Sequence, residues 1–197
     1  MIEHIKGRLI EKTPTYAIIE TGGIGYYVNT SLNTYSKIPD KEACSLYIHF
    51  SVREDAQTLY GFYEKEERDL FRNLISASGI GPSTAQVLLS SLSPDEAVQA
   101  ILSADVATIQ KVKGIGSKTA QRIILDLKDK ISKGSLGATE GINALNSSNK
   151  SHQDALSALL MLGFGKAATE KVLDKVVKDS GQDISVEQLI KAALQRL

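Results

Sequence analysis

The chain has 197 residues and carries 23 basic against 23 acidic side chains, so it is no polycation that binds anions through bulk charge. Its single cysteine, Cys44, excludes an internal disulfide and indicates a reducing compartment. The histidines His4, His49 and His152 are scattered and form no metal-ligand pattern. No apolar run approaches the ~18 residues of a membrane helix, and the amino terminus lacks a signal-peptide profile. We therefore expect a soluble, cytoplasmic protein that needs no metal or other cofactor.

Residues 1–62 show the alternation of apolar and polar side chains that is typical of β-strands. The pattern is clearest from Cys44 to Arg53, and it recurs after Gly22-Gly23, a pair typical of a tight hairpin turn. Strands of this kind favour an OB-like β-barrel, a fold that often binds nucleic acid, although the pattern also fits a purely structural β-domain. The predicted strands lie near residues 2–11, 15–21, 24–28, 44–53 and 57–62.

Residues 63–133 follow a helical period instead. Ser93-Pro94-Asp95-Glu96 has the sequence of a capping box with proline at the first helical position, which fixes one helix start. The helices are predicted at 64–77, 83–91, 94–103, 105–112 and 117–132.

Within this helical segment, a glycine turn with matching flanks occurs twice, 35 residues apart. Gly79-Ile80-Gly81 is followed by Pro-Ser-Thr-Ala-Gln, and Gly114-Ile115-Gly116 by Ser-Lys-Thr-Ala-Gln. Apolar positions recur at the same offset, as in Leu88 and Ile123. The repeat predicts two helix-hairpin-helix units.

Such a turn can offer backbone N–H groups to a phosphate. Glycine adopts a positive φ without a Cβ clash, and it leaves room for the anion to approach the amides. The helix that follows adds unpaired N–H groups and the positive end of its dipole. A single copy is better explained as an ordinary helix cap, but two copies with shared flanks favour a duplex held across its sugar-phosphate backbone.

Positive charge gathers beside the second turn. Between Lys111 and Lys133 there are seven basic and two acidic residues, a local excess of +5 that suits a phosphate backbone. The predicted DNA-binding residues are Gly79, Ile80, Gly81, Ser83, Thr84, Lys111, Gly114, Ile115, Gly116, Ser117, Lys118, Thr119 and Arg122.

The helical pattern breaks at 134–150, which is rich in Gly, Ser, Thr and Asn and is predicted to be a flexible linker. Residues 151–197 then form a third domain with helices at 152–162, 166–179 and 185–196. Its expected core contains Leu156, Leu159, Leu160, Val172, Leu173, Val176, Leu189, Ile190 and Leu194. The turn Leu160-Met161-Leu162-Gly163-Phe164 has two interpretations, completion of this core or a site for a protein partner.

Catalytic motifs are missing from the sequence. Gly165-Lys166 is followed by Ala167, so there is no phosphate-binding P-loop, and no catalytic triad or carboxylate cluster is present. We therefore expect no enzymatic step from this chain. Two alternative functions remain. One is a nuclease or glycosylase that the hairpins anchor to DNA, which would need such a cluster, and the other is a protein adaptor that does not bind DNA.

Several short motifs occur along the whole chain in a highly specific combination. They are Met1-Ile2 with Lys6-Gly7, Gly22-Gly23-Ile24-Gly25-Tyr26, His49-Phe50-Ser51-Val52-Arg53-Glu54-Asp55-Ala56-Gln57, Leu59-Tyr60-Gly61-Phe62, the two glycine hairpins, and Ala158-Leu159-Leu160-Met161-Leu162-Gly163-Phe164. In these motifs the chain resembles the RuvA family, whose members are the Holliday-junction-binding subunits of the bacterial branch-migration complex.

The resemblance implies an α+β multidomain protein: an OB-like barrel at 1–62, a double helix-hairpin-helix domain at 63–133, and a three-helix domain at 151–197 that binds the RuvB ATPase motor. It implies a fourfold homotetramer, or a face-to-face octamer, that holds an open, planar four-way junction during recombination and repair, including the SOS response. It also implies an acidic pin at Glu54 and Asp55, and the RuvC resolvase as a further partner.

Three positions depart from the usual family pattern. Ser83 and Ser117 stand where lysine or arginine is common, and Lys113 stands where proline is common. Backbone amides, helped by Lys111, Lys118 and Arg122, are therefore expected to contribute more of the phosphate binding than in lysine-rich relatives.

Overall fold

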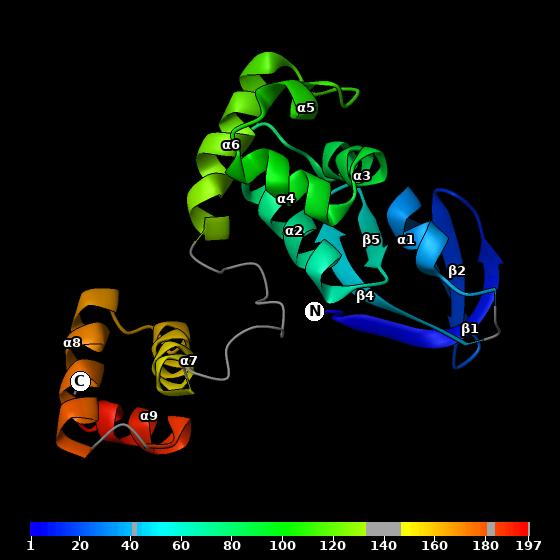
Figure 1. Ribbon diagram of the computed structural model, residues 1–197. Helices are drawn as coiled ribbons and strands as arrows, with labels where there is room; N and C mark the ends of the chain where they lie inside the picture. Colours follow the sequence, from blue (N-terminus) through cyan, green and yellow to red (C-terminus); the bar gives the residue numbers. More distant parts are fainter. Residues whose placement is uncertain (41–42, 133–146, 181–183, 197) are drawn as a thin grey trace. The chain divides into compact units, whose positions relative to one another are not determined.

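The structure of the protein, a computed structural model, describes residues 1–40, 43–132, 147–180 and 184–196. The chain forms two compact units. The first contains a β-barrel and helices α1–α6, and the second contains α7–α9 (Figure 1). The predicted α+β multidomain class is confirmed.

The five predicted strands form one closed barrel. Their order is β1-β2-β3-β5-β4, with β3 and β5 parallel and the other neighbours antiparallel. Gly22 and Gly23 both have positive φ and turn β2 into β3, as their sequence predicts. Closure leaves no open edge for another strand. The strands are β1 (His4–Lys12), β2 (Tyr16–Thr21), β3 (Ile24–Thr30), β4 (Ala43–Val52) and β5 (Gln57–Phe62).

A short helix between β3 and β4, α1 (Leu32–Lys37), was not predicted because six residues are too few to show a helical period. The later helices lie within one or two residues of the predicted bounds at most ends. The capping box of Ser93 and Glu96 is formed as predicted. These helices are α2 (Lys65–Ser76), α3 (Pro82–Ser91), α4 (Pro94–Leu102), α5 (Val106–Gln110) and α6 (Ser117–Ser132).

The end of β5 packs into the core of the helices, whereas the barrel interior forms a separate core around Ile19, Leu46 and Ile48. Tyr60 and Phe62 at the end of β5 belong to the same buried cluster as Phe71 and Leu74 of α2 and the inner faces of α3–α6. The rings of Phe62 and Phe71 lie 4.9 Å apart between centroids. Packing of this kind is close and resists sliding, so the helices that bear the glycine turns are held firmly against the barrel.

A buried carboxyl group joins α1 to α2. Glu67 accepts hydrogen bonds from the hydroxyl groups of Ser31 and Thr34, and Thr34 Oγ1 also accepts from the backbone N–H of Tyr63. Burial raises the pKa of Glu67 above its usual value, while the hydrogen bonds from Ser31 and Thr34 act in the opposite direction. The two hydroxyl groups thus replace part of the solvation that the carboxylate loses on folding, and the effect of burial prevails.

The second unit packs three helices around a small core: α7 (Ser147–Met161), α8 (Lys166–Ser180) and α9 (Val186–Leu194). Two core predictions are wrong, since Leu160 and Leu194 are 37% and 43% exposed. In so small a bundle the helical period does not decide which flank of the apolar stripe faces the core. Of the predicted linker, residues 134–146 lie outside the described residues. The last four, 147–150, belong to α7, because Ser and Asn suit helix starts as well as loops.

We expect Thr34→Val to destabilise the first unit by about 2 kcal/mol at neutral pH, because the substitution removes a hydrogen bond to a buried carboxylate and leaves the Tyr63 N–H unpaired. Loss of the hydroxyl should raise the folded-state pKa of Glu67 further. A raised pKa gives stability that is present at low pH and lost as pH rises, so the deficit should grow with pH.

Urea denaturation of the variant and the wild type at about pH 4 and about pH 7.5 measures this deficit. The matched control is Thr21→Val, which changes an exposed threonine on β2. A deficit of equal size at the two pH values would contradict the role given to Glu67.

Candidate nucleic-acid interface

The two glycine turns have the same backbone geometry. We name Gly79–Gly81 loop one and Gly114–Gly116 loop two. The first glycine of each has a positive φ, 89° at Gly79 and 91° at Gly114. The isoleucine N–H of each loop donates to the carbonyl three residues earlier, at 3.3 Å for Ile80 and 3.1 Å for Ile115. Both isoleucine side chains are buried. The sequence repeat is therefore a repeat of structure.

The second glycine of each loop begins a helix and leaves its face open. The carbonyls of Gly81 and Gly116 accept the first helical hydrogen bonds, from Ala85 N at 3.0 Å and Ala120 N at 2.9 Å. A Cβ built on any of the four loop glycines would meet no atom within 4 Å. The N–H groups of the first helical turn have no partner within the helix, so an anion has both donors and room in front of each loop.

The two loops differ in how many amides they offer. Loop one is followed by Pro82 at the first helical position, and proline has no N–H. Loop two has Ser117 there, which keeps its amide. Of the predicted hydroxyl-bearing residues, Ser83 and Ser117 are exposed, and Thr84 and Thr119 are both half-buried. Loop two therefore offers one more backbone donor to an anion than loop one does.

Unpaired positive charge surrounds loop two. The side chains of Lys111, Lys113, Lys118 and Arg122 are exposed, and none of them forms an ion pair with another residue of the described chain. Exposed cations whose charge no acidic side chain balances can attract phosphates.

Helix α6 begins at loop two and carries two cations that contact residues just before loop one. The sequence did not predict this contact between distant segments. Arg122 Nη1 lies 3.4 Å from Ser78 Oγ, directly before loop one, and Lys130 Nζ lies 3.1 Å from Ser76 Oγ. Asp126, between them on the same helix face, accepts from the Ser78 N–H at 3.4 Å. The four-residue spacing of these three side chains indicates that they share one face of a helix. It does not indicate which distant segment that face contacts.

The predicted acidic pin lies at the tip of the hairpin between β4 and β5. Arg53 N donates to the carbonyl of Ala56 at 2.8 Å and closes the turn. Glu54 and Asp55 between them are both exposed. Neither takes part in an ion pair with any described residue, so their charges face solvent.

A third turn of the same backbone type joins α7 to α8. Gly163 has a φ of 96°, and the carbonyl of Gly165 accepts from Thr169 N at 3.0 Å. The residues before it are apolar: Met161 is 90% and Leu162 62% exposed. The lysine after it, Lys166, pairs with Glu170 at 3.8 Å. Phe164 packs against the core of the unit. Phe164 therefore helps to complete the core, while Met161 and Leu162 lie on the surface, where a partner site remains a prediction.

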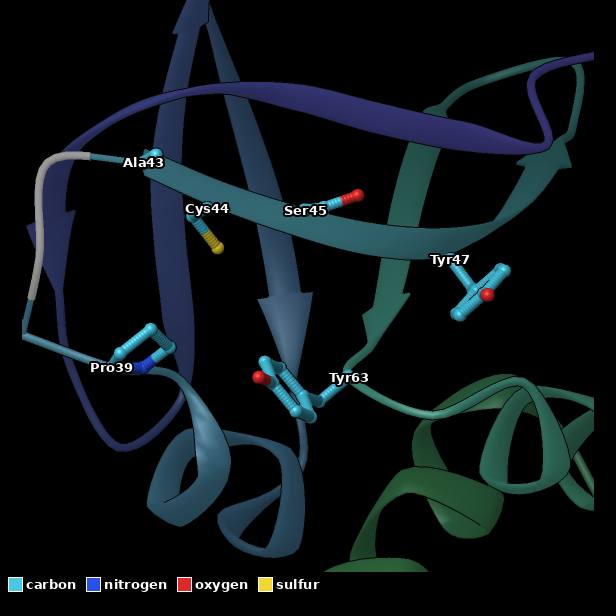
Figure 2. Close-up of a pocket in the computed structure, with 6 residues that line it drawn as sticks. All are labelled: Pro39, Ala43, Cys44, Ser45, Tyr47 and Tyr63. Atoms are coloured by element: carbon cyan, nitrogen blue, oxygen red, sulfur yellow. The ribbon is translucent and has the colours of Figure 1, made fainter.

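A hollow of about 400 Å³ opens beside the start of β4 (Figure 2). The Cys44 thiol is buried at its edge, and burial raises its pKa. The lining carries no cation and no residue of loops one or two. It consists of Pro39, Ala43, Cys44, Ser45, Tyr47 and Tyr63.

The part of the chain that the structure describes offers neither a metal site nor a membrane span. It contains no group of three or more His, Cys, Asp or Glu side chains placed to hold a metal ion. None of its helices is long and apolar enough to cross a membrane.

Three family models match successive parts of the chain. The RuvA N-terminal domain matches residues 1–61, the SAM-like helix-hairpin-helix tandem matches residues 71–129, and the RuvA C-terminal domain matches residues 150–197. The tandem model contains both glycine loops, and the C-terminal model contains the third turn.

Whole-length relatives agree with these matches. Proteins named Holliday junction branch migration complex subunit RuvA are 56% identical over 197 residues in Christiangramia forsetii, 48% over 204 residues in Bacteroides fragilis and 47% over 197 residues in Flavobacterium psychrophilum. Each alignment covers 100% of both chains. The chain therefore belongs to the RuvA family.

Proposed function

We propose that this protein binds four-way DNA junctions and serves as the non-catalytic subunit of a branch-migration complex. The observation that carries the proposal is the pair of matching glycine loops, each with open space before its amides. The names of the whole-length relatives point to the same activity. In this proposal the DNA-binding residues are those predicted from the sequence, with Lys130 added.

Each loop would bind a backbone phosphate through amide N–H groups and the helix dipole. Such contacts carry no sequence information, because every nucleotide presents the same phosphate. A protein that guides a moving junction needs this property, since the sequence at the crossover changes with each step. Lys118 and Arg122 would add long-range attraction without adding base preference.

The acidic pin would select branched over linear DNA. Unit charges about 4 Å apart at an effective dielectric near 20 interact by about 4 kcal/mol, so Glu54 and Asp55 would repel a phosphate strand that crosses the pin. At the centre of an open, planar junction the strands diverge and leave room for acidic tips. A linear duplex has no such opening.

The assembly we propose is a fourfold homotetramer, or an octamer in which two such tetramers pack face to face. Four copies would present one pin and two loops to each arm of the junction. The RuvB motor would bind the exposed Met161 and Leu162 and supply ATP hydrolysis, and the RuvC resolvase would act on the same junction. No catalytic step would belong to this chain.

The direct test is a gel shift that compares a four-way junction with a linear duplex of equal length. The proposal expects tight binding of the junction, weaker binding of the duplex, and intact DNA after incubation with Mg²⁺. Equal affinity for the two DNAs, or cleavage of the junction by this protein alone, would contradict it.

Substitution of the second loop glycines should block phosphate approach without disturbing the fold. We expect Gly81→Val and Gly116→Val each to weaken junction binding by about tenfold or more, as for loss of hydrogen bonds to a charged group. A Cβ at either position has open space around it, so thermal stability should change little. Fluorescence anisotropy with labelled junction measures the affinity.

The matched control is Gly165→Val, which makes the same change at the helix start of the third turn. This control should bind the junction as the wild type does. If Gly81→Val and Gly116→Val also bind with wild-type affinity, the loops are not the phosphate sites.

Neutralisation of the pin should reduce selectivity. In the double variant Glu54→Gln, Asp55→Asn, we expect affinity for linear duplex to rise by about threefold to tenfold, because two repulsive charges are lost at an exposed, salt-screened position. Competition between labelled junction and unlabelled duplex at fixed salt gives the ratio. An unchanged ratio would refute the pin.

The exposed apolar residues of the third turn should matter for the motor and not for DNA. We expect Met161→Ser with Leu162→Ser to weaken binding of the RuvB motor by about tenfold or more, as for loss of an apolar interface anchor. Leu194→Ser, at another exposed leucine of this unit, is the control. Stimulation of the motor's ATPase that stays at the wild-type level would show that the motor binds elsewhere.

A further inference from the structure

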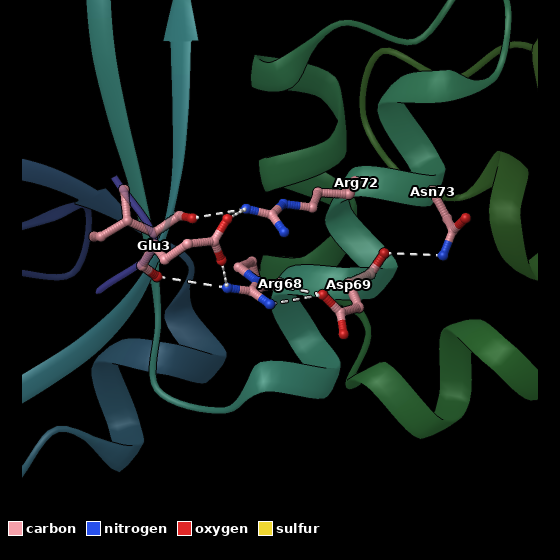
Figure 3. A network of polar contacts seen from close by, with 6 residues as sticks. Glu3, Arg68, Asp69, Arg72 and Asn73 are labelled. Atoms are coloured by element: carbon pink, nitrogen blue, oxygen red, sulfur yellow. Dashed lines mark hydrogen bonds and ion pairs between the residues drawn. The ribbon is translucent and has the colours of Figure 1, made fainter. Parts of the chain in front are cut away.

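Two arginines on α2 hold this helix against the barrel. Arg72 Nη2 donates to Glu3 Oε1 and to the carbonyl of Ile48, both at 3.2 Å. Arg68 Nη1 donates to Glu3 Oε2 at 2.6 Å, and its guanidinium also pairs with Asp69 at 3.1 Å. Figure 3 shows both guanidinium groups directed at Glu3 from one side of the helix. We name Glu3, Arg68 and Arg72 the arginine clamp.

The clamp is a built contact and not a loose surface pair. Arg68 is only 5% exposed and lies over the ring of Tyr47, 5.4 Å from its centroid. The backbone carbonyl of Glu3 accepts from Ile48 N at 2.8 Å, so the residue that bears this carboxylate is fixed to β4. The hydrogen bond from Arg72 is the main cause that lowers the pKa of Glu3. Only Arg68 is buried, since the side chains of Glu3 and Arg72 are 49% and 32% exposed. The clamp therefore contributes through its several directed bonds, which define a geometry, more than through burial of charge.

The clamp lies at the start of two chain segments, one that leads to the acidic pin and one that leads to loop one. From Ile48, β4 and the turn after it run on for six residues, about 20 Å of extended chain, to the pin at Glu54. From Arg72, α2 and its C-terminal turn run on for seven residues, about 10 Å, to loop one at Gly79. Arg72 therefore links the strand that carries the pin directly to the helix that leads into a glycine loop.

We infer that the arginine clamp determines specificity: it fixes the acidic pin relative to loop one, and thereby sets the preference for a four-way junction over linear duplex. The inference rests on the proposed function. Coulomb repulsion falls as distance grows, so a pin that can move away from a strand held in loop one loses its effect. Neither Glu3 nor Arg72 needs to touch DNA for this role.

The test uses double substitutions in the full-length protein that leave the net charge unchanged. The clamp variant is Glu3→Gln with Arg72→Gln, and Arg68 is kept because it is buried. The control variant is Glu20→Gln with Arg8→Gln, which removes an exposed barrel ion pair of similar length, 3.1 Å. Both variants are also made in the pin-neutral background (Glu54→Gln, Asp55→Asn). Dissociation constants for junction and linear duplex are measured at one salt concentration.

We expect the clamp variant to reduce the junction-to-duplex affinity ratio by about threefold to tenfold, a typical effect for residues that couple two sites without touching either ligand. The control should keep the wild-type ratio. In the pin-neutral background the clamp substitutions should have no further effect on the ratio, because there is no pin left to position.

Three results would overturn the inference. One is an equal change in both affinities, which a merely structural role predicts. Another is a fall in the ratio that persists in the pin-neutral background. A wild type that does not prefer the junction would overturn the proposed function first, and the inference with it, so the two failures are distinguishable.

Discussion

A backbone amide can bind a phosphate only where it lacks a partner in the fold and where no side chain stands before it. The start of a helix supplies the first condition and glycine the second. In loops one and two, a buried isoleucine between the glycines anchors the turn, while the glycines face open space. The proposed activity depends on this division of each loop into a side that the buried isoleucine anchors and a side that the glycines leave open.

Backbone geometry alone does not distinguish a phosphate site. The turn at Gly163 has the same positive φ and the same helix start as loops one and two. What differs is the surroundings. Lys113 and Lys118 flank loop two without an ion pair in the described chain. Met161 and Leu162 precede the third turn, and Lys166 after it pairs with Glu170. Under the proposed function, one local fold would serve two kinds of partner, and the neighbouring side chains would select between them.

Much of the fold could be predicted from local signals. The alternation of apolar and polar residues indicated the strands, and Gly22-Gly23 indicated the hairpin between two of them. The 35-residue repeat indicated both loops and the helices beside them. Contacts between distant segments could not be predicted. Arg68 meets Glu3 across 65 positions, and Arg122 reaches Ser78, directly before loop one. The short helix α1 and the outward side of Leu160 were missed because periodicity is weak in six residues and ambiguous at the edge of a helical stripe.

Amide hydrogen exchange, with and without a bound four-way junction, tests the central claim most directly. The account predicts that the junction slows exchange at residues 79–84 and 114–119 together, while the similar turn at 163–169 is unaffected and serves as internal reference. Slowed exchange at the third turn alone, or unchanged exchange in both loops at saturating junction, would contradict the claim that backbone amides hold the DNA.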